Sequence, residues 1–210
     1  MQAQYHRQIT EQALKGYFSP RALKVIVSAN LGQDSPWRGL FGHPEYHFDE
    51  SQFTAGWNYV AEQRSSVNIR LSQGKTADAW QAFGRLTHAV QDFFAHSNYV
   101  RLWMENHADR NRDERAASID PVDEEIMKSS HLISGNIYYP LEVFTFLPWF
   151  KEWARQRLPR DAHAWMNLDS PGQGPLFELA LQAAELRTKL EYDWLCRPMT
   201  PNMLRAFRDW

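Results

Sequence analysis

The sequence predicts an all-α protein, a compact multi-helix bundle. Apolar residues recur at helical spacing through most of the 210 residues, and runs of alternating β-branched residues between turn signals are almost absent. The chain is 43% hydrophobic, which supplies material for one substantial buried core, and its length fits one domain over residues 1–210. We therefore expect a single helical domain with irregular connections.

The first helices are predicted from their capping residues. Thr10 can cap a short helix over residues 10–16. Ser19 is followed by Pro20, which is the pairing typical of a helix N-terminus, and this second helix is expected to end near Gly32.

The later helices are predicted from periodicity and from breakers. Helical spacing continues over residues 51–71, and a long helix follows over residues 76–96. Two further helices are expected over residues 149–157 and 176–196, each ending before a proline. The segment 105–125 is dense in charge, which is typical of a solvated excursion from the bundle.

Composition excludes several classes of function. With 23 Lys and Arg against 25 Asp and Glu, the chain has no basic excess, so nucleic acid is not the expected partner. The single cysteine, Cys196, excludes an internal disulfide and a four-cysteine zinc site, and we expect it to be a structural thiol. The first residues carry no export signal, which predicts a cytoplasmic protein or one exported by a route that uses no signal peptide.

The most apolar stretch covers residues 138–150. It contains Glu142 and two prolines and is shorter than the ~20 residues of a membrane-spanning helix. We expect a buried loop and helix start here. The alternative is an aromatic lip that makes a peripheral contact with a membrane.

Three residues with metal-binding side chains are spaced at intervals of four. His88 and Asp92 lie one helical turn apart and can bind one metal ion. His96 would lie ~12 Å along the axis from His88, at ~1.5 Å per residue. It can therefore share that metal only if the end of the helix bends. Otherwise it would bind a second metal ion, with Asp92 bridging the two ions. The alternative is that this side of the helix, which also carries Gln81 and Arg85, is a plain solvent face.

The sequence also resembles a known family. The segments Ala29-Asn30-Leu31-Gly32-Gln33-Asp34 and His47-Phe48-Asp49 are similar to parts of the zinc-dependent phospholipase C superfamily, which includes single-strand-specific zinc nucleases. The run His88-Ala89-Val90-Gln91-Asp92-Phe93-Phe94-Ala95-His96-Ser97-Asn98-Tyr99-Val100 strongly resembles the signature of the HET-C-like branch of that superfamily. The resemblance implies a helical bundle of the phospholipase C type.

The resemblance also implies a set of functional residues and a cofactor of two or three zinc ions. Asp34 would bridge two ions and act as the catalytic general base. Asp49 and Asn98 are candidates for supporting the ligands or contacting substrate. His131 has no position in the motif but is a further candidate of this kind, and it is not expected to bind metal directly. The implied metal ligands are His6, Asp34, His47, His88, Asp92, His96, His163 and Asp169.

We accordingly expect a zinc-dependent phosphoric ester hydrolase that cleaves phospholipids as a phospholipase C does, using a metal-bridged hydroxide. One alternative is a zinc-dependent nuclease or other phosphodiesterase. Another is a HET-C-like toxin, effector or recognition module without catalysis, in which the metal is structural. Family likeness does not determine substrate, so the three remain open at this point.

Overall fold

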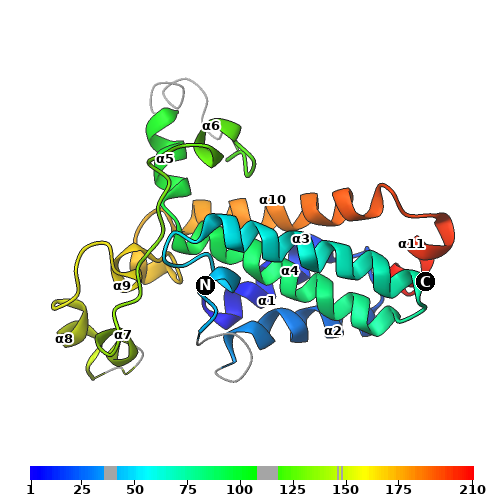
Figure 1. Cartoon of the computed structure of the whole chain (residues 1–210), viewed down its shortest axis with the longest axis horizontal. Coiled ribbons are helices and arrows are strands. Elements are labelled where there is room, and N and C mark those ends of the chain that lie inside the picture. The colour runs from blue at the N-terminus through cyan, green and yellow to red at the C-terminus, as the bar shows by residue number, and fades with distance from the viewer. Residues whose placement is uncertain (36–41, 108–117, 146, 148) are drawn as a thin grey trace.

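The structure is a computed structural model that describes residues 1–35, 42–107, 118–145, 147 and 149–210. These residues contain helices, short 3-10 turns and two isolated β-bridges but no strand, which confirms the all-α prediction. Five long helices form an elongated bundle, namely α1 (Ala3–Leu14), α2 (Pro20–Leu31), α3 (Phe53–Ser72), α4 (Thr76–His96) and α10 (Phe177–Cys196) (Figure 1).

Shorter elements surround this bundle. The helices α7 (Leu141–Phe144), α8 (Lys151–Arg155) and α9 (His163–Met166) form a lobe at one end, and α11 (Pro201–Arg208) lies at the other (Figure 1). The helices α5 (Tyr99–Asn106) and α6 (Glu124–Met127) project from the side of the bundle near the lobe. The 3-10 turns η1 (Gly32–Asp34), η2 (Pro44–Tyr46) and η4 (Pro171–Gln173) complete the described elements.

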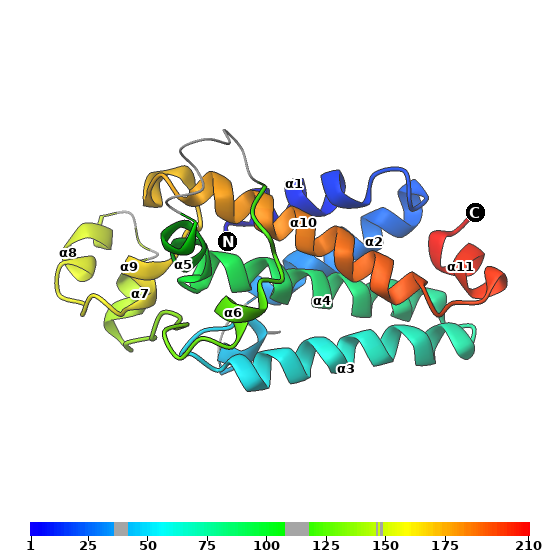
Figure 2. The same cartoon turned by 90° about the horizontal axis from the view of Figure 1, so that it is seen from above.

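Helix α4 is the central element of the core. It packs against α2, α3 and α10, and the view from above shows it running between these helices (Figure 2). Phe83, Phe93 and Phe94 on α4 have no exposed surface. Since burying one such side chain contributes about 1.5–3 kcal/mol, this helix carries much of the stability of the bundle.

A glycine allows α2 and α4 to approach closely. A Cβ atom on Gly84 would lie 2.3 Å from the carbonyl oxygen of Ile26 and 2.8 Å from the side chain of Ala29. No other residue fits without separating the helices, because a real Cβ atom is not found so near a backbone oxygen. The close approach positions the end of α2, and therefore η1, beside α4.

Several helix boundaries agree with the sequence. The hydroxyl of Ser19 accepts a hydrogen bond from the amide of Ala22 at 3.1 Å, and α2 ends before Gly32, as predicted. The observed α3, α4 and α10 begin and end within two residues of the predicted ranges. These elements have strong periodicity and clear breakers, so their local sequence is sufficient to define them.

The predicted start of the first helix is wrong. Helix α1 begins at Ala3, and Thr10 lies buried within it rather than at its N-terminus. The hydroxyl of Thr10 donates to the carbonyl oxygen of His6 at 2.8 Å, one turn earlier in the same helix. Threonine can make this bond inside a helix as well as a capping bond outside it, and the sequence alone did not distinguish the two.

The short helices were mostly missed. The helix expected over 149–157 is only α8, and α5, α6, α7, α9 and α11 were not predicted. For α11 a local signal was present, since the hydroxyl of Thr200 accepts from the amide of Met203 at 3.3 Å and Pro201 follows the cap. The other short helices depend on tertiary packing, because isolated helices of this length are not stable.

The prediction of a buried segment over 138–150 is also wrong. Tyr139 is 57% exposed and Trp149 is 93% exposed. The lobe instead has a small core of its own, made by Leu158, Ala162 and Ala164. Of the charged excursion expected over 105–125, residues 108–117 lie outside the described part of the chain, and nearby Ile119 is packed into the main core. No helix in the described ranges combines the length and apolar character needed to cross a bilayer.

Candidate metal centre

Helix α4 presents His88, Asp92 and His96 along one side, and all three side chains are buried. Earlier on the same side, Gln81 is exposed and Arg85 is half-buried. The prediction of a solvent face therefore holds only for the first half of the helix. It is wrong at His88 and Asp92, because α1 and η1 pack against α4.

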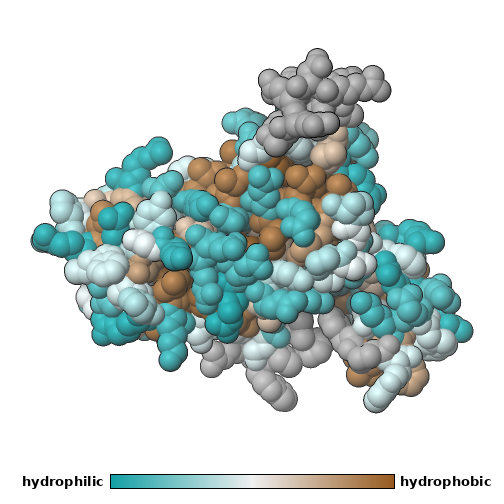
Figure 3. Space-filling model, turned by 180° about the vertical axis from the view of Figure 1, so that it is seen from behind, coloured by the Kyte–Doolittle hydropathy of each residue, from teal (hydrophilic) through white to brown (hydrophobic). Residues whose placement is uncertain are grey.

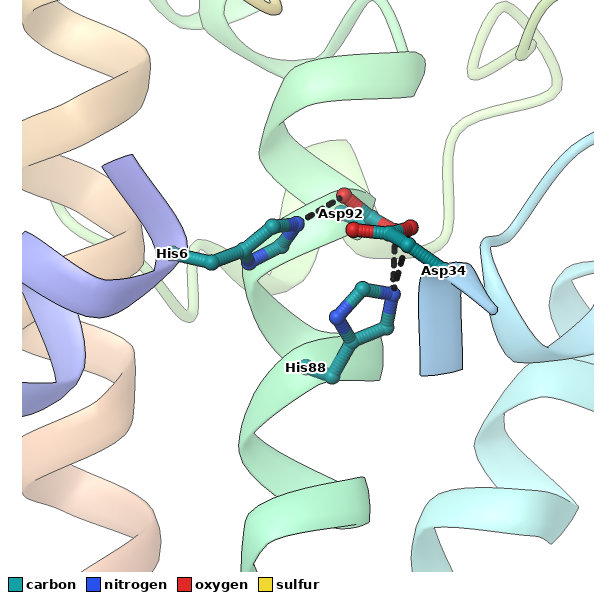
Figure 4. A group of neighbouring side chains, drawn as sticks. All are labelled: His6, Asp34, His88 and Asp92. Carbon is teal, nitrogen blue, oxygen red and sulfur yellow. Dashed lines mark ion pairs between the residues drawn. The ribbon is translucent and has the colours of Figure 1, made fainter. Parts of the chain in front are cut away.

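A first cluster of potential ligands contains His6, Asp34, His88 and Asp92, whose ligand atoms all lie within 4.8 Å of one another (Figure 4). Asp92 Oδ1 is 3.1 Å from His6 Nε2, and Asp92 Oδ2 is 2.9 Å from His88 Nε2. His88 Nε2 also lies 3.5 Å from Asp34 Oδ1. These residues come from α1, η1 and α4, so the cluster exists only when the three elements are packed together.

A buried hydrogen-bond network determines the orientation of Gln91 in α4. Its side-chain nitrogen donates to the hydroxyls of Thr10 and Thr188 at 3.0 and 3.1 Å. Both hydroxyls donate their own protons to helix carbonyls, so toward Gln91 they can only accept. The side-chain oxygen of Gln91 must then face the other way, toward His6 and the amide group of Asn30.

This orientation assigns the ring proton of His6. Nδ1 of His6 lies 2.7 Å from the Gln91 oxygen, which can only accept, so Nδ1 carries the proton and donates it. The opposite nitrogen, Nε2, points at the Asp92 carboxylate (Figure 4), and it forms no hydrogen bond with any of the residues that the structure describes. A histidine that donates one nitrogen to an oriented acceptor and leaves the other for a cation is the usual arrangement at metal sites.

The spacing of these atoms fits a shared cation. Two ligand atoms that are each about 2.1 Å from a tetrahedral ion lie about 3.4 Å apart, and three nitrogen-to-oxygen distances in the first cluster are 3.1, 3.5 and 2.9 Å. A buried nitrogen without a hydrogen bond is costly unless it has another partner. The donors are imidazole nitrogens and carboxylate oxygens, the set expected for a metal held without cysteine.

A second cluster contains Asp49, His96 and His163, with ligand atoms again within 4.8 Å of one another. Asp49 Oδ1 lies 3.1 Å from His96 Nδ1 and 4.0 Å from His163 Nε2. His163 begins α9 in the lobe, so this cluster joins the lobe to the bundle. A Cβ atom on Gly135 would lie 2.4 Å from the Cα atom of His163, so this glycine allows the approach.

Three groups lie between the two clusters. His47, which follows η2, places Nδ1 2.8 Å from Asp92 Oδ2 and 3.1 Å from His88 Nε2. The amino group of Met1 lies 2.6 Å from Asp92 Oδ1 and 3.0 Å from Asp169 Oδ1. Asp169 Oδ1 in turn lies 3.2 Å from His96 Nε2. The described residues thus contain two adjacent buried clusters that could each bind a metal ion.

The titration of the clusters follows from burial and opposite charge. Burial lowers the pKa of His88 to about 4, in spite of the neighbouring carboxylate of Asp92, so the ring is neutral at pH 7. Burial also opposes the charged form of His96, but Asp92 and Asp49 outweigh it and raise the pKa of His96 well above its usual value. Burial alone would raise the pKa of Asp92, yet the Met1 amino group and the histidines hold it well below its usual value. The carboxylate of Asp92 is therefore ionised and ready to bind a cation.

Members of both clusters line one cavity of about 350 Å³. Asp34 from the first cluster and Asp49, His96 and His163 from the second face this space. Ile137, Tyr139 and Val143 add an apolar part to the lining. A small molecule in the cavity would therefore have both potential metal ligands and apolar side chains around it.

The structure brings together nearly all the residues that the sequence nominated. His6, Asp34, His47, His88, Asp92, His96, His163, Asp169 and Asp49 all belong to the clusters or lie between them. Asn98 and His131 do not. The side chain of Asn98 binds the backbone of residues 131 and 133, His131 is exposed, and neither lines the cavity.

Sequence reasoning missed three groups of the centre, one of which is the amino group of Met1 described above. Gln91 orients His6, and Glu142 lies with its Oε1 3.5 Å from His163 Nδ1 while accepting from the amide of Ala164 at 2.7 Å. Gln91 lies inside the motif that contains His88 and Asp92, so its position was a usable signal. Glu142 is an isolated acid in an apolar stretch. Its position was the usable signal, because a charged side chain is hard to bury without a partner.

The other histidines lie outside the centre. His43 is exposed and stacks on Tyr46. His107 is half-buried and stacks on Trp103, with its Nδ1 2.9 Å from the carbonyl oxygen of Trp103. Both have local roles at the ends of their elements.

Comparison with known proteins identifies the family. A family model described as the VWA7 N-terminal domain matches residues 3–125, more than half of the chain. The chain belongs to the VWA7 N-terminal domain family. No curated protein and no solved structure matches it. The matched range contains the whole first cluster, together with His47, Asp49 and His96, whereas His163 and Asp169 lie beyond it.

Proposed function

We propose that this protein is a zinc-dependent phosphoesterase that cleaves phospholipids as a phospholipase C does. The observation that carries the proposal is the pair of buried His and Asp clusters that open on one cavity. Two adjacent cations are the arrangement that many phosphoesterases use to bind and cleave a phosphodiester. The similarity of residues 88–100 to the HET-C-like signature supports the same proposal.

Zinc is the proposed ion because of the chemistry of the donors. Nitrogen from His6 and His88 with oxygen from Asp34 and Asp92 is a set that zinc accepts in tetrahedral geometry. The second cluster would supply two imidazoles and one carboxylate to a second ion. The resemblance allows a third ion, but the two clusters supply donors for two. When bound, paired zinc ions lower the pKa of water toward about 7 and stabilise charge on phosphate oxygens.

Asp34 is the proposed general base. Its side chain is 32% exposed and lines the cavity, so its carboxylate can reach a water molecule placed beside the substrate. Asp92 is fully buried and fixed by several partners, which suits a ligand rather than a group that exchanges protons. Attack of water on phosphorus would transfer a proton to Asp34 and break the bond to the alcohol oxygen, which would take a proton from solvent.

The lining of the cavity favours a phospholipid over a nucleic acid. No Lys or Arg is found among the described residues that line the 350 Å³ cavity, whereas binding of a phosphate backbone usually requires a basic track. The apolar wall at Ile137, Tyr139 and Val143 matches a substrate with a hydrocarbon portion. Phosphatidylcholine is therefore the first substrate to test.

The experiment compares metal content and activity in matched variants. Purified protein should contain about two zinc ions per chain by elemental analysis, and it should hydrolyse phosphatidylcholine in mixed micelles. Asp34→Asn should reduce the turnover number by roughly 10²–10⁴-fold, because the proton acceptor is lost, while much of the zinc remains. Asp193→Asn, at an exposed position of α10, is the control and should leave both unchanged.

Three outcomes would contradict the proposal. A zinc content near zero after purification and reconstitution would exclude a zinc-dependent mechanism. Cleavage of single-stranded DNA in preference to phosphatidylcholine, over a range of salt concentrations, would indicate a nuclease. Bound zinc without hydrolysis of either substrate, together with an unchanged biological effect of Asp34→Asn, would indicate a structural metal.

A further inference from the structure

The lobe exposes a cluster of large apolar side chains. Seven of the eleven exposed large hydrophobic residues in the described part of the chain fall between positions 139 and 153. Six of them, which we name the aromatic lip, lie on α7, on α8 and between them, and Figure 3 shows hydrophobic surface on this lobe at the lower right. The aromatic lip consists of Val143, Phe144, Leu147, Trp149, Phe150 and Trp153.

The rings of the aromatic lip contact one another rather than the core. Phe144 lies 6.0 Å from Phe150 and 6.2 Å from Trp153, measured between ring centroids, and Phe150 lies 6.4 Å from Trp153. None of the three belongs to the main core or to the small core of the lobe. Their apolar surface is therefore held outward as one patch, and contiguous patches of this kind mark interaction sites.

Basic residues lie within and just after the aromatic lip in the sequence. Between positions 149 and 160, Lys151, Arg155, Arg157 and Arg160 stand against the single acid Glu152, a net charge of +3 in a chain whose total is −2. Arg157 stacks on the ring of Trp153 at 4.3 Å, which places its charge at the edge of the patch. Aromatic residues bordered by Lys and Arg are typical of surfaces that rest on anionic membranes.

The aromatic lip is continuous with the mouth of the cavity. Val143 belongs both to the lip and to the cavity wall, and Tyr139, 57% exposed, lies beside it in the same wall. A neighbouring cavity of about 420 Å³ shares His163 and Asp169 with the first and is lined by Lys151 and Arg155. A bilayer in contact with the lip would place lipid head groups beside the metal centre.

We propose that the aromatic lip docks on a lipid bilayer that contains anionic phospholipid. This inference rests on the proposed function, because it assigns the aromatic lip as the surface that brings the lipid substrate to the metal centre. Docking itself requires no hydrolysis. It follows from the apolar patch, the flanking charge and the continuity with the cavity.

The experiment measures vesicle binding by flotation in the presence of EDTA, which prevents turnover. The full chain should float with vesicles of phosphatidylcholine and phosphatidylglycerol and less with vesicles of phosphatidylcholine alone. The double variant Trp149→Ser/Phe150→Ser should bind at least about tenfold more weakly, since two large apolar side chains no longer enter the interface. Circular dichroism and thermal unfolding should be unchanged, because both side chains are exposed.

Matched controls test position and charge. Trp210→Ser removes a tryptophan that is 69% exposed at the far end of the bundle and should leave binding unchanged (Figure 1). Lys151→Gln/Arg160→Gln should weaken binding to anionic vesicles by about fivefold per residue and leave binding to neutral vesicles unchanged. Lys15→Gln/Lys24→Gln removes two exposed charges from elsewhere and should have no effect.

Failure of this inference and failure of the proposed function are distinguishable. Absence of flotation with either vesicle, or equal losses for Trp149→Ser/Phe150→Ser and Trp210→Ser, would overturn the docking surface. Association of the chain into dimers that Trp149→Ser/Phe150→Ser dissolves, without vesicle binding, would also overturn it. Vesicle binding without lipid hydrolysis would support the docking surface and count against the phospholipase. Hydrolysis of a short-chain monomeric lipid without vesicle binding would support the phospholipase and count against the docking surface.

Discussion

At the scale of single residues, Gln91 controls how His6 faces the first cluster. Its amide is oriented by two threonine hydroxyls that can only accept from it, and its oxygen receives the Nδ1 proton of His6. The other ring nitrogen is thereby left for a cation beside Asp92. Groups that orient a ligand in this way affect metal affinity although they do not touch the metal.

Replacing Gln91 tests this role. Gln91→Met keeps the approximate volume but leaves Nδ1 of His6 without its acceptor and the two threonine hydroxyls without the amide that donates to them, so zinc affinity should fall by about 10–100-fold. The free energy of unfolding should fall by about 1–3 kcal/mol, the cost of leaving a buried polar group unpaired. Gln81→Met, at an exposed site of the same helix, should change neither quantity in zinc titration and urea unfolding. Equal zinc affinity in the two variants would contradict the role.

The histidines also predict how acid acts on metal binding. The pKa of His96 lies well above its usual value, so without metal this ring is protonated at pH 7 and must lose a proton to bind a cation. His88, with a pKa of about 4, is already neutral and does not compete. Zinc affinity should therefore fall as the pH decreases from about 8 to about 5.

Calorimetry in two buffers of different ionisation enthalpy would detect this proton. The difference in apparent binding enthalpy should show proton release at pH 7, since His96 carries a proton before zinc binds and the Asp92 carboxylate also raises the pKa of His47 against the effect of burial. His131→Gln, at an exposed position, serves as the control and should not change the number of protons released on zinc binding. Zinc binding that is equally strong at both ends of the pH range would show that His96 is not a ligand.

At the scale of elements, the contact between α2 and α4 positions both sides of the first cluster. Helix α4 carries His88 and Asp92, and α2 leads directly into η1 with Asp34. The contact depends on Gly84, where a Cβ atom would meet the backbone of α2 at 2.3 Å. A small change in this contact should affect stability and the metal centre together.

Gly84→Ala should lower the free energy of unfolding by about 1–3 kcal/mol, because the added methyl group forces the two helices apart. The movement should also weaken zinc binding, since Asp34 shifts with the end of α2. Gly172→Ala is the matched control, because the nearest atom to its added Cβ is Ser170 Oγ at 3.9 Å. Urea unfolding and zinc titration of both variants would test the expectation, which fails if Gly84→Ala is as stable as the control.

At the scale of the whole molecule, the ligands join parts that are far apart in the sequence. His6 comes from the first helix, His88 and Asp92 from the centre of the bundle, and His163 from the lobe. A cation bound by such a set stabilises the folded state, because the unfolded chain does not hold the donors together. Metal binding should therefore strengthen the attachment of the lobe to the bundle.

Thermal unfolding with and without zinc tests this linkage. Free zinc at about 100 times the dissociation constant should stabilise the protein by about 2.7 kcal/mol for each site and raise Tm, and EDTA should reverse the effect. His163→Ala should lose a large part of the gain, because the second cluster then has two donors left. His131→Ala, which alters an exposed histidine, should keep the full gain. An identical response of the two variants would exclude His163 as a ligand.

The sequence by itself determined the long helices and the identity of most potential ligands. Caps, breakers and apolar periodicity act over a few residues, so α2, α3, α4 and α10 could be predicted within two residues. The spacing of His88, Asp92 and His96 has the same local character. The eight nominated ligands rested on the resemblance, which preserves their order along the chain.

Only the tertiary structure decided which surfaces are covered. The side of α4 that carries His88 and Asp92 is buried because α1 and η1 pack over it, and the apolar segment of the lobe is exposed because no element in the described part of the chain covers it. The contributions of Gln91 and Glu142 likewise depend on partners that are distant in the sequence. Burial is a property of long-range packing, and local patterns do not specify which element will cover a given face.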